Sequence, residues 1–222
     1  MIRVAVLGAT GQTGTRVVQQ ALDAGHAVKA LVRSPEKMSI KHERLQIEKV
    51  NIFDTSSMLP HFKDTDAIVH CVGVNVQWNP TTLFSDSIKA IVEAMRGAQI
   101  KKIAILSLQL SDAKISEEFG WLMKWAFSLF FWFIKPITDD VVKMEHYLQG
   151  ECDDLEWTAV KPVQLVNKPP SGKIIHHNEG QYLEGGQNWT ISRGDVAKFM
   201  LQVVTSKDKE FANKLISMGT KD

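Results

Sequence analysis

The sequence is poor in cysteine and has no excess of charge of either sign. Its two cysteines, Cys71 and Cys152, form no C-x-x-C pair, which argues against a disulfide framework and favours a reducing compartment. No metal site is expected. The 26 lysines and arginines are matched by 25 acidic residues, so the chain has no net field that would attract nucleic acid or an anionic membrane.

No targeting segment is expected at the start of the chain. The first strand is expected to begin at the second residue, which leaves no room for a secretory or transit peptide, so we expect a cytoplasmic protein. At 222 residues the chain is long enough to bury a sizeable core, and it is expected to form one domain, 1–222.

Glycine is concentrated in one short motif, GATGQTG, in which Gly8, Gly11 and Gly14 stand three residues apart. The β-branched run Val4–Leu7 before it is typical of a strand covered on both faces. After it, apolar residues recur at helical spacing until Gly25. A strand, a glycine turn and a helix N-terminus together predict a site for a pyrophosphate. On the glycines alone, a tight turn that binds nothing stays an alternative, because the spacing differs from G-x-G-x-x-G.

A second strand-like run, Ala27–Val32, ends in Arg33. An acidic residue at this place would hold the 2′-hydroxyl of NAD, whereas arginine offers a charged fork to the 2′-phosphate of NADP. Ser34 and Lys37 add a hydroxyl and a second cation. The motif therefore predicts NADPH as the cofactor, with a solvated loop charge as the other interpretation of Arg33.

Strand and helix patterns alternate along the rest of the chain, which is typical of an α/β, Rossmann-like doubly wound parallel sheet. Ligands of such sheets bind beyond the carboxyl ends of the strands. Asp54 and Gly73, which follow the third and fourth strands, are therefore candidates for the adenosine side, although Asp54 is equally suited to cap a helix.

The polar, Gly- and Pro-rich stretch 167–190 is expected to form a small substrate-side lobe. Expected strands are Leu45–Val50, Ala67–Val72, Lys102–Leu106, Trp157–Lys161 and Lys214–Met218, and expected helices are Thr55–Phe62, Thr81–Gly97, Thr138–Leu148 and Gly194–Val204.

The motifs GATGQTG and ALVRSPEK resemble those of atypical short-chain dehydrogenases/reductases, the group that includes NmrA-like proteins and the biliverdin-IXβ/flavin reductases. Weaker similarity continues through ITDDVVKMEHYL, WTAVKP and ISRGDVAKFML. The resemblance implies a Rossmann fold, NADP(H) at the glycine turn, and a nicotinamide lying along the backbone of Pro162 and Val163 with Ser107 beside it. The residues expected to hold the pyrophosphate are Gly8, Thr10, Gly11, Gln12, Thr13 and Gly14.

The tyrosine and lysine that short-chain dehydrogenases use to protonate a carbonyl substrate are missing. No Y-x-x-x-K motif occurs, since Tyr147 is followed at four by Glu151 and Tyr182 by Gly186. In AILSLQLSD the family's double serine is reduced to Ser107, which is left as a weak catalytic candidate. A small aromatic or conjugated substrate, such as a flavin or a linear tetrapyrrole, needs proximity more than a tuned acid. It suits this chain better than a simple carbonyl does.

The most apolar stretch, Trp121–Ile134, is too short to span a bilayer, for which about 20 residues are needed. It carries one charge and three of the six tryptophans. It belongs to a segment, 113–136, that looks like an insertion relative to the family it resembles. Four roles are open: a buried helix, a lid over an aromatic ligand, a dimer face or other protein contact, and an in-plane membrane contact. The lid is favoured, because the segment follows the fifth strand on the substrate side.

Two functions of different classes follow from these features. The first is an NADPH-dependent reductase that transfers hydride to a flavin, quinone or similar conjugated acceptor without a Tyr/Lys proton relay. The alternative is a non-catalytic, NmrA-like redox sensor that binds NADP(H) and passes its redox state to a protein partner. Cofactor turnover separates the two.

Overall fold

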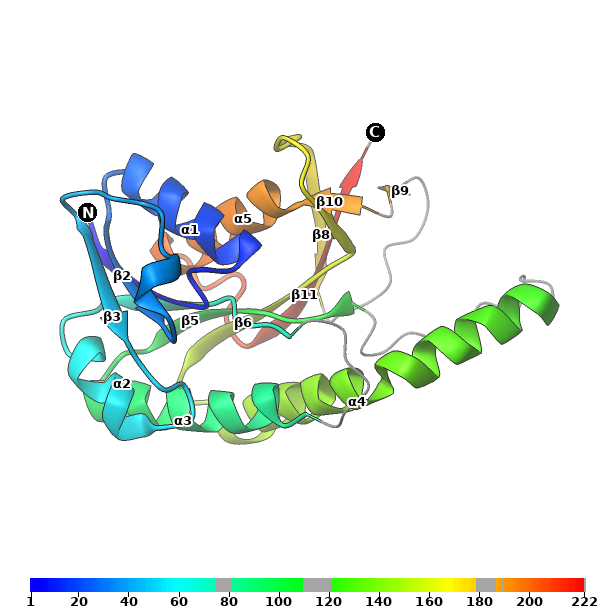
Figure 1. The fold of residues 1–222 in the computed structure, drawn as a ribbon, viewed down its shortest axis with the longest axis horizontal. Helices are drawn as coiled ribbons and strands as arrows, with labels where there is room; N and C mark the ends of the chain where they lie inside the picture. Colours follow the sequence, from blue (N-terminus) through cyan, green and yellow to red (C-terminus); the bar gives the residue numbers. More distant parts are fainter. Residues whose placement is uncertain (75–80, 110–120, 179–186, 189, 222) are drawn as a thin grey trace.

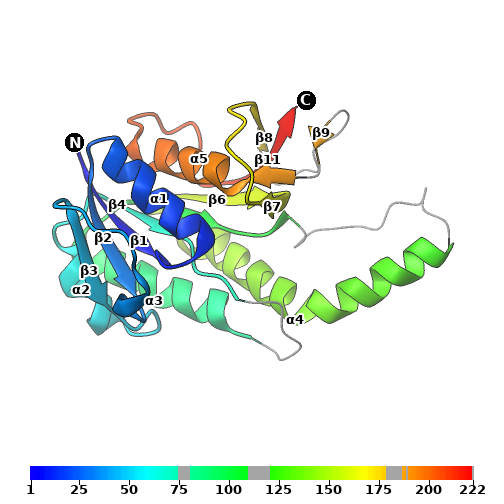
Figure 2. The same cartoon turned by 45° about the horizontal axis from the view of Figure 1, so that its top comes forward.

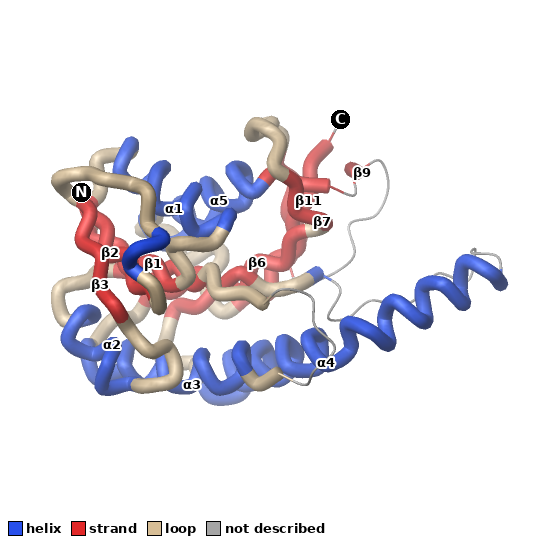
Figure 3. The backbone as a smooth tube through the Cα atoms, in the orientation of Figure 1, coloured by secondary structure: helices blue, strands red, loops and turns tan. Residues whose placement is uncertain are grey.

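The structure is a computed structural model of the chain, and it describes residues 1–74, 81–109, 121–178, 187–188 and 190–221. At 121–131, 175, 177, 178, 187 and 188 it describes the backbone alone. Helices and strands alternate along most of the described chain, as the periodicity predicts (Figure 3).

A sheet of parallel strands forms the centre of the molecule (Figure 1). From edge to edge its seven parallel strands are β3 (Leu45–Lys49), β2 (Ala27–Val32), β1 (Arg3–Leu7), β4 (Ala67–His70), β5 (Lys102–Leu106), β6 (Glu156–Pro162) and β11 (Lys214–Lys221). The chain winds outward from β1 to one edge and then from β4 to the other. This order confirms the expected doubly wound, Rossmann-like fold and places the switch point between β1 and β4.

Helices cover both faces of this sheet (Figure 2). One face carries α1 (Gln12–Asp23) and α5 (Arg193–Thr205), and the other carries α2 (Thr55–Phe62), α3 (Leu83–Ala98) and the inner part of α4 (Trp121–Glu151). A short 3₁₀ turn, η1 (Pro35–Lys37), follows β2. Each layer buries an apolar stripe against the β-branched strand residues, which is the arrangement that a two-sided parallel sheet requires.

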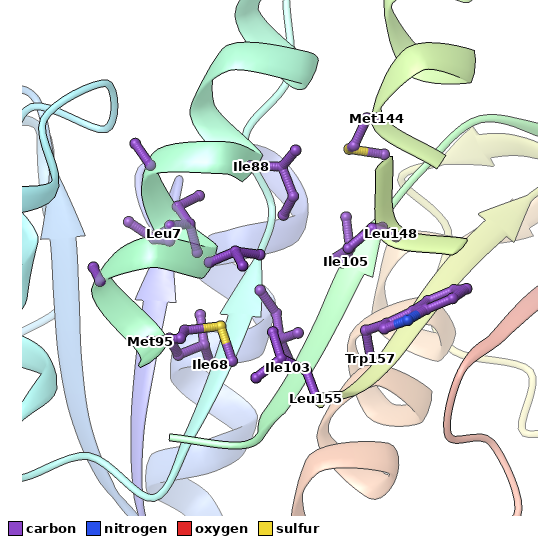
Figure 4. Packing of buried hydrophobic residues seen from close by; sticks show 14 of the residues in the cluster. Leu7, Ile68, Ile88, Met95, Ile103, Ile105, Met144, Leu148, Leu155 and Trp157 are labelled. Atoms are coloured by element: carbon purple, nitrogen blue, oxygen red, sulfur yellow. The ribbon is translucent and has the colours of Figure 1, made fainter. Parts of the chain in front are cut away.

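The larger core lies between the sheet and the α2–α3–α4 layer (Figure 4). Alternate residues of the central strands point into it, and helical residues three and four apart meet them. In the close-up, residues from β1, β4 and β5 face those of α3 and α4. The residues labelled there are Leu7, Ile68, Ile88, Met95, Ile103, Ile105, Met144, Leu148, Leu155 and Trp157, all at most 2% exposed.

The helix α4 is longer than the sequence predicts. The expected helix Thr138–Leu148 and the aromatic stretch before it form one continuous helix of 31 residues, despite Pro136 inside it. The hydroxyl of Thr138 donates to the carbonyl of Lys135 at 3.0 Å, and Lys135 pairs with Asp139 at 2.7 Å, so local contacts span the proline. Prolines end most helices but are tolerated where other contacts support the turn.

The outer half of α4 extends beyond the sheet in both views (Figures 1 and 2). Near its middle, Trp132 is 55% and Phe133 is 36% exposed, whereas Ile134 is 7% exposed. A buried helix is therefore the wrong description of Trp132 and Phe133. Residues 113–120 of the expected insertion lie outside the described residues. No described helix is both long enough and apolar enough to cross a bilayer.

The stretch 167–190 is tied to the main sheet. Its strand β8 (Ile174–Asn178) lies antiparallel on β11 at the sheet edge, and the two-residue β9 (Gln187–Asn188) also pairs with β11. A separate parallel pair joins β7 (Gln164–Val166) to β10 (Thr190–Ser192). Residues 179–186 lie outside the described residues, and a substrate-side role for this stretch stays a prediction.

The buried His70 gives the fold a pH dependence that can be measured. Its side chain is fully buried at the end of β4, and neither ring nitrogen has a hydrogen-bond partner among the described residues. Burial lowers the pKa of His70 from 6.5 to about 4. The unfolded chain therefore takes up this proton near pH 6.5 and the folded chain only near pH 4, so stability falls as the pH drops through this window.

We expect this single group to remove about 3 kcal/mol of stability between pH 7 and pH 4. Urea unfolding across this range measures it, and His70→Leu should flatten the curve because the variant has no proton to take up there. A variant whose stability falls as steeply as that of the wild type would contradict the assignment.

Candidate functional site

The glycine turn brings three backbone segments into close contact. Gly8 has a φ of +74°, and a Cβ there would lie 2.6 Å from the carbonyl oxygen of Cys71, just after β4. A Cβ on Gly14 would lie 2.3 Å from the carbonyl oxygen of Gly8. Only glycine fits either position, because a side chain would displace backbone. The motif thus packs the start of α1 against the ends of β1 and β4.

The start of α1 presents free backbone donors. Gly11 is the N-cap and has no side chain that could cap the helix. Its own N–H donates to the carbonyl of Gly8 at 2.9 Å. In the described part of the chain, no hydrogen-bond acceptor is recorded for the N–H groups of Gln12, Thr13 and Gly14. Free N–H groups at the positive end of a helix dipole fit a diphosphate.

Two arginines add positive charge beside this turn, which the sequence analysis missed. Arg16 and Arg193 both donate to the side-chain oxygen of Asn167, at 3.3 and 3.1 Å, and the amide of Asn167 donates to Gln12 at 3.0 Å. Burial, and after it the charge of Arg16, lowers the pKa of Arg193. Because Asn167 is far from Gln12 in the sequence, no local pattern could have shown this cluster.

On the side expected to hold adenosine, Arg33 is exposed just beyond β2, with no ion-pair partner among the described residues. Ser34 is half-buried and is the N-cap residue of η1. Asp54 caps α2, since its carboxylate accepts from the N–H and hydroxyl of Ser56 at 2.9 and 2.7 Å, and the hydroxyl contact lowers the pKa of Asp54. A Cβ on Gly73 would meet open space. Asp54 is thus a helix cap here, and its contact with adenosine stays a prediction.

At the ends of β5 and β6 the predicted nicotinamide-side residues lie close together. The N–H of Ser107 donates to the carbonyl of Val160 at 2.8 Å, which continues the β5–β6 ladder. Pro162 is buried, and the half-buried Val163 donates its N–H to Met218 of β11 at 2.9 Å. The ladder therefore places Ser107 beside the end of β6.

A buried polar cluster that the sequence analysis did not assign lies beneath Ser107. The Ser107 hydroxyl donates to Glu145 of α4 at 2.5 Å, and the ammonium of Lys161 pairs with the other carboxylate oxygen of Glu145 at 2.9 Å. Lys161 has no exposed surface, and Glu145 and Ser107 are at most 3% exposed. The signal in the sequence is an acidic residue on an apolar helix face, because Glu145 stands between the buried Met144 and Leu148.

The sheet register aligns these features along one edge. Leu7 of β1 lies opposite Leu31 of β2 and His70 of β4, and His70 lies opposite Ile105 of β5. The carboxyl ends of the five adjacent strands β2, β1, β4, β5 and β6 therefore form one row. The predicted residues at or just beyond this row are Gly8, Arg33, Gly73, Ser107 and Pro162. A glycine turn, a helix N-terminus and a switch point at this edge define a Rossmann-type dinucleotide-binding protein.

Comparison with known proteins agrees with this class. The NAD(P)H-binding family profile matches residues 8–207, so the chain belongs to the NAD(P)H-binding family. An oxidoreductase of Paecilomyces divaricatus is 24% identical over 238 residues, which cover 99% of this chain and 86% of that protein.

Two solved structures share the fold. A short-chain dehydrogenase/reductase of Veillonella parvula in complex with NADP aligns with a TM-score of 0.74 at 18% identity, over 98% of this chain and 94% of that one. A Streptococcus pneumoniae protein described as a candidate NADH-flavin reductase aligns with a TM-score of 0.74 at 21% identity, over 100% of both chains.

Arg33 should decide between the two nicotinamide cofactors. A charge-assisted contact is worth about 1.5–3 kcal/mol, so Arg33→Ala should raise the Kd for NADPH about 10- to 150-fold and leave the Kd for NADH unchanged. Titration of both cofactors measures this, with Lys41→Ala, an exposed charge farther along the loop, as the control. Equal affinities in the wild type, or a ratio that survives Arg33→Ala, would refute the role of Arg33.

Proposed function

We propose that the chain is an NADPH-dependent reductase that transfers hydride to a flavin, quinone or similar conjugated acceptor without a Tyr/Lys proton relay. The observation that carries this proposal is the hydrogen bond that the Ser107 hydroxyl makes. At the strand end where a carbonyl reductase donates a proton, the Ser107 hydroxyl donates to Glu145. In the described part of the chain no tyrosine hydroxyl is recorded as hydrogen-bonded to it.

Among the described residues, Tyr147 offers no substitute acid. Tyr147 belongs to α4 and packs toward α3, where the Lys89 ammonium lies 5.9 Å from its ring, and burial raises the pKa of Tyr147. Tyr182 lies outside the described residues. A hydride acceptor with a conjugated ring system spreads the charge that it gains and can take its proton from solvent, so it needs no such acid.

In this mechanism the chain binds and orients. The N–H groups that begin α1 hold the diphosphate, and Arg33 with Ser34 holds the 2′-phosphate. Ser107, Pro162 and Val163 shape the nicotinamide end. NADPH supplies the hydride when it is bound. The oxidoreductase name of the Paecilomyces relative and the candidate flavin reductase among the structural relatives support a redox reaction of this kind.

The second candidate function is an NADP(H) sensor that binds a protein partner. Trp132 and Phe133 are exposed on the part of α4 that leaves the sheet, which favours a contact with another molecule. The missing Tyr/Lys dyad suits this role equally well. A sensor would bind NADPH and turn over nothing.

The experiment that separates the two functions is NADPH oxidation against a panel of FMN, riboflavin, quinones, biliverdin and simple aldehydes. The reductase proposal expects oxidation with a conjugated acceptor and none above background with aldehydes. Tight NADPH binding without oxidation by any acceptor would favour the sensor.

If no side-chain acid is needed, Ser107→Ala should lower turnover of a flavin acceptor by less than about tenfold, against the 10²- to 10⁴-fold typical of a general acid. Asp139→Ala and Lys143→Ala, on α4, should behave in the same way. Steady-state kcat values test this. A thousandfold loss in any of the three variants would reveal a proton donor.

The exposed aromatic residues of α4 allow a test of the hypothesis that Trp121–Ile134 forms a lid over the acceptor. If this part of α4 covers the acceptor, Trp132→Ala should raise the KM for a flavin or quinone about tenfold, the effect of a contact worth about 1.4 kcal/mol, and leave the Kd for NADPH unchanged. Ile47→Ala, which removes an exposed apolar side chain from β3, is the control. Acceptor kinetics equal to those of the wild type would exclude Trp132 from a lid.

A further inference from the structure

Gln109 is a buried side chain whose hydrogen-bonding groups are unused. It lies two residues beyond Ser107 at the end of β5 and is 6% exposed. Neither its side-chain oxygen nor its nitrogen has a hydrogen-bond partner among the described residues. Leaving a buried amide unpaired costs free energy that most folds avoid. A primary carboxamide of this kind offers two donor hydrogens and one acceptor oxygen.

The hydroxyl of Ser107, unlike the amide of Gln109, already makes a hydrogen bond. A hydroxyl has one proton, and Ser107 donates it to Glu145, whose second oxygen is held by Lys161. The oxygen of Ser107 therefore has only acceptor capacity left. Since two residues of chain span at most about 7 Å, Ser107 and Gln109 can contact one small chemical group together.

We propose that Ser107 and Gln109 form a subsite for an amide edge, meaning an N–H group next to a carbonyl. The nitrogen of Gln109 donates to the carbonyl, while the oxygens of Gln109 and Ser107 accept from the N–H. The subsite rests on the proposed function, because that function puts the reacting end of the ligand at the end of β5. Its role is recognition, and no proton is transferred.

Two sources could supply the amide edge. One is the carboxamide of the nicotinamide itself, and the other is the imide edge of a flavin acceptor. A quinone or an aldehyde has carbonyl oxygens without a neighbouring N–H, so it would leave both acceptor oxygens of the subsite unpaired. Sites built to bond a polar group discriminate strongly against analogues that lack it.

Binding titrations with matched ligands test the subsite. NADPH is compared with its 3-acetylpyridine analogue, which replaces the carboxamide by an acetyl group, and riboflavin is compared with N3-methylriboflavin. Each analogue keeps the carbonyl and loses the N–H. In the wild type, one analogue should bind at least about tenfold more weakly than its parent, the effect of one lost hydrogen bond. The pair that shows the difference identifies the source.

In Gln109→Leu, which has a similar volume and no polar atoms, this difference should fall below threefold, while the variant melts no lower than the wild type because an unpaired buried amide is gone. Ser107→Ala should reduce the difference in part. Gln20→Leu, the same change on α1 at the contact with α5, should leave the difference in affinity between parent ligand and analogue unchanged. Gln109→Met carries the same test if the leucine variant does not fold.

The proposal is overturned if the wild type discriminates in neither ligand pair, or if the discrimination survives in Gln109→Leu. These titrations need no turnover. A chain that discriminates without oxidising NADPH would therefore keep the subsite and lose the reductase function.

Discussion

The approach of Gly8 to the backbone after β4 is the constraint on which the rest of the site depends. A side chain at Gly8 would come within 2.6 Å of the Cys71 carbonyl, and one at Gly14 within 2.3 Å of the Gly8 carbonyl. With glycine at both positions, α1 can begin directly against the switch point. Its free N–H groups then face the edge at which β2, β4, β5 and β6 also end. The proposed cofactor site and the packing of the switch point therefore depend on the same glycine motif.

Most of the sheet could be predicted because its signals are local. Ala27–Val32 and Lys102–Leu106 are short apolar runs between polar breakers, and the observed strands have the same bounds. The continuity of α4 across Pro136 could not be predicted, because a proline is typical of a helix end. Buried Asp140, which accepts from the backbone N–H of Phe84 at 2.8 Å, joins α4 to the start of α3, a contact that no local pattern shows.

The site residues, too, divide into those that a local motif marks and those that only the fold brings together. Of the residues marked by a motif, Gly8 and Arg33 lie just beyond the predicted strand ends, and Gly14 lies in the first turn of α1. Glu145 lies in the weakly similar stretch ITDDVVKMEHYL, but nothing there marks it as a site residue. The register of β5 against β6, with α4 above them, brings it to Ser107 across 38 residues. Ser107 is tied to α4 through the buried pair of Glu145 and Lys161, because its hydroxyl donates to Glu145, whose other carboxylate oxygen is held by Lys161.

Amide hydrogen exchange with and without NADPH tests most directly whether the start of α1 holds the nucleotide. Exchange at Gln12, Thr13 and Gly14 should slow by up to about 100-fold when NADPH is present at 100 times its Kd. The strand β3, at the edge of the sheet beyond β2, should exchange as before. NADPH binding that left exchange at these three amides unchanged would place the nucleotide elsewhere and contradict the site described above.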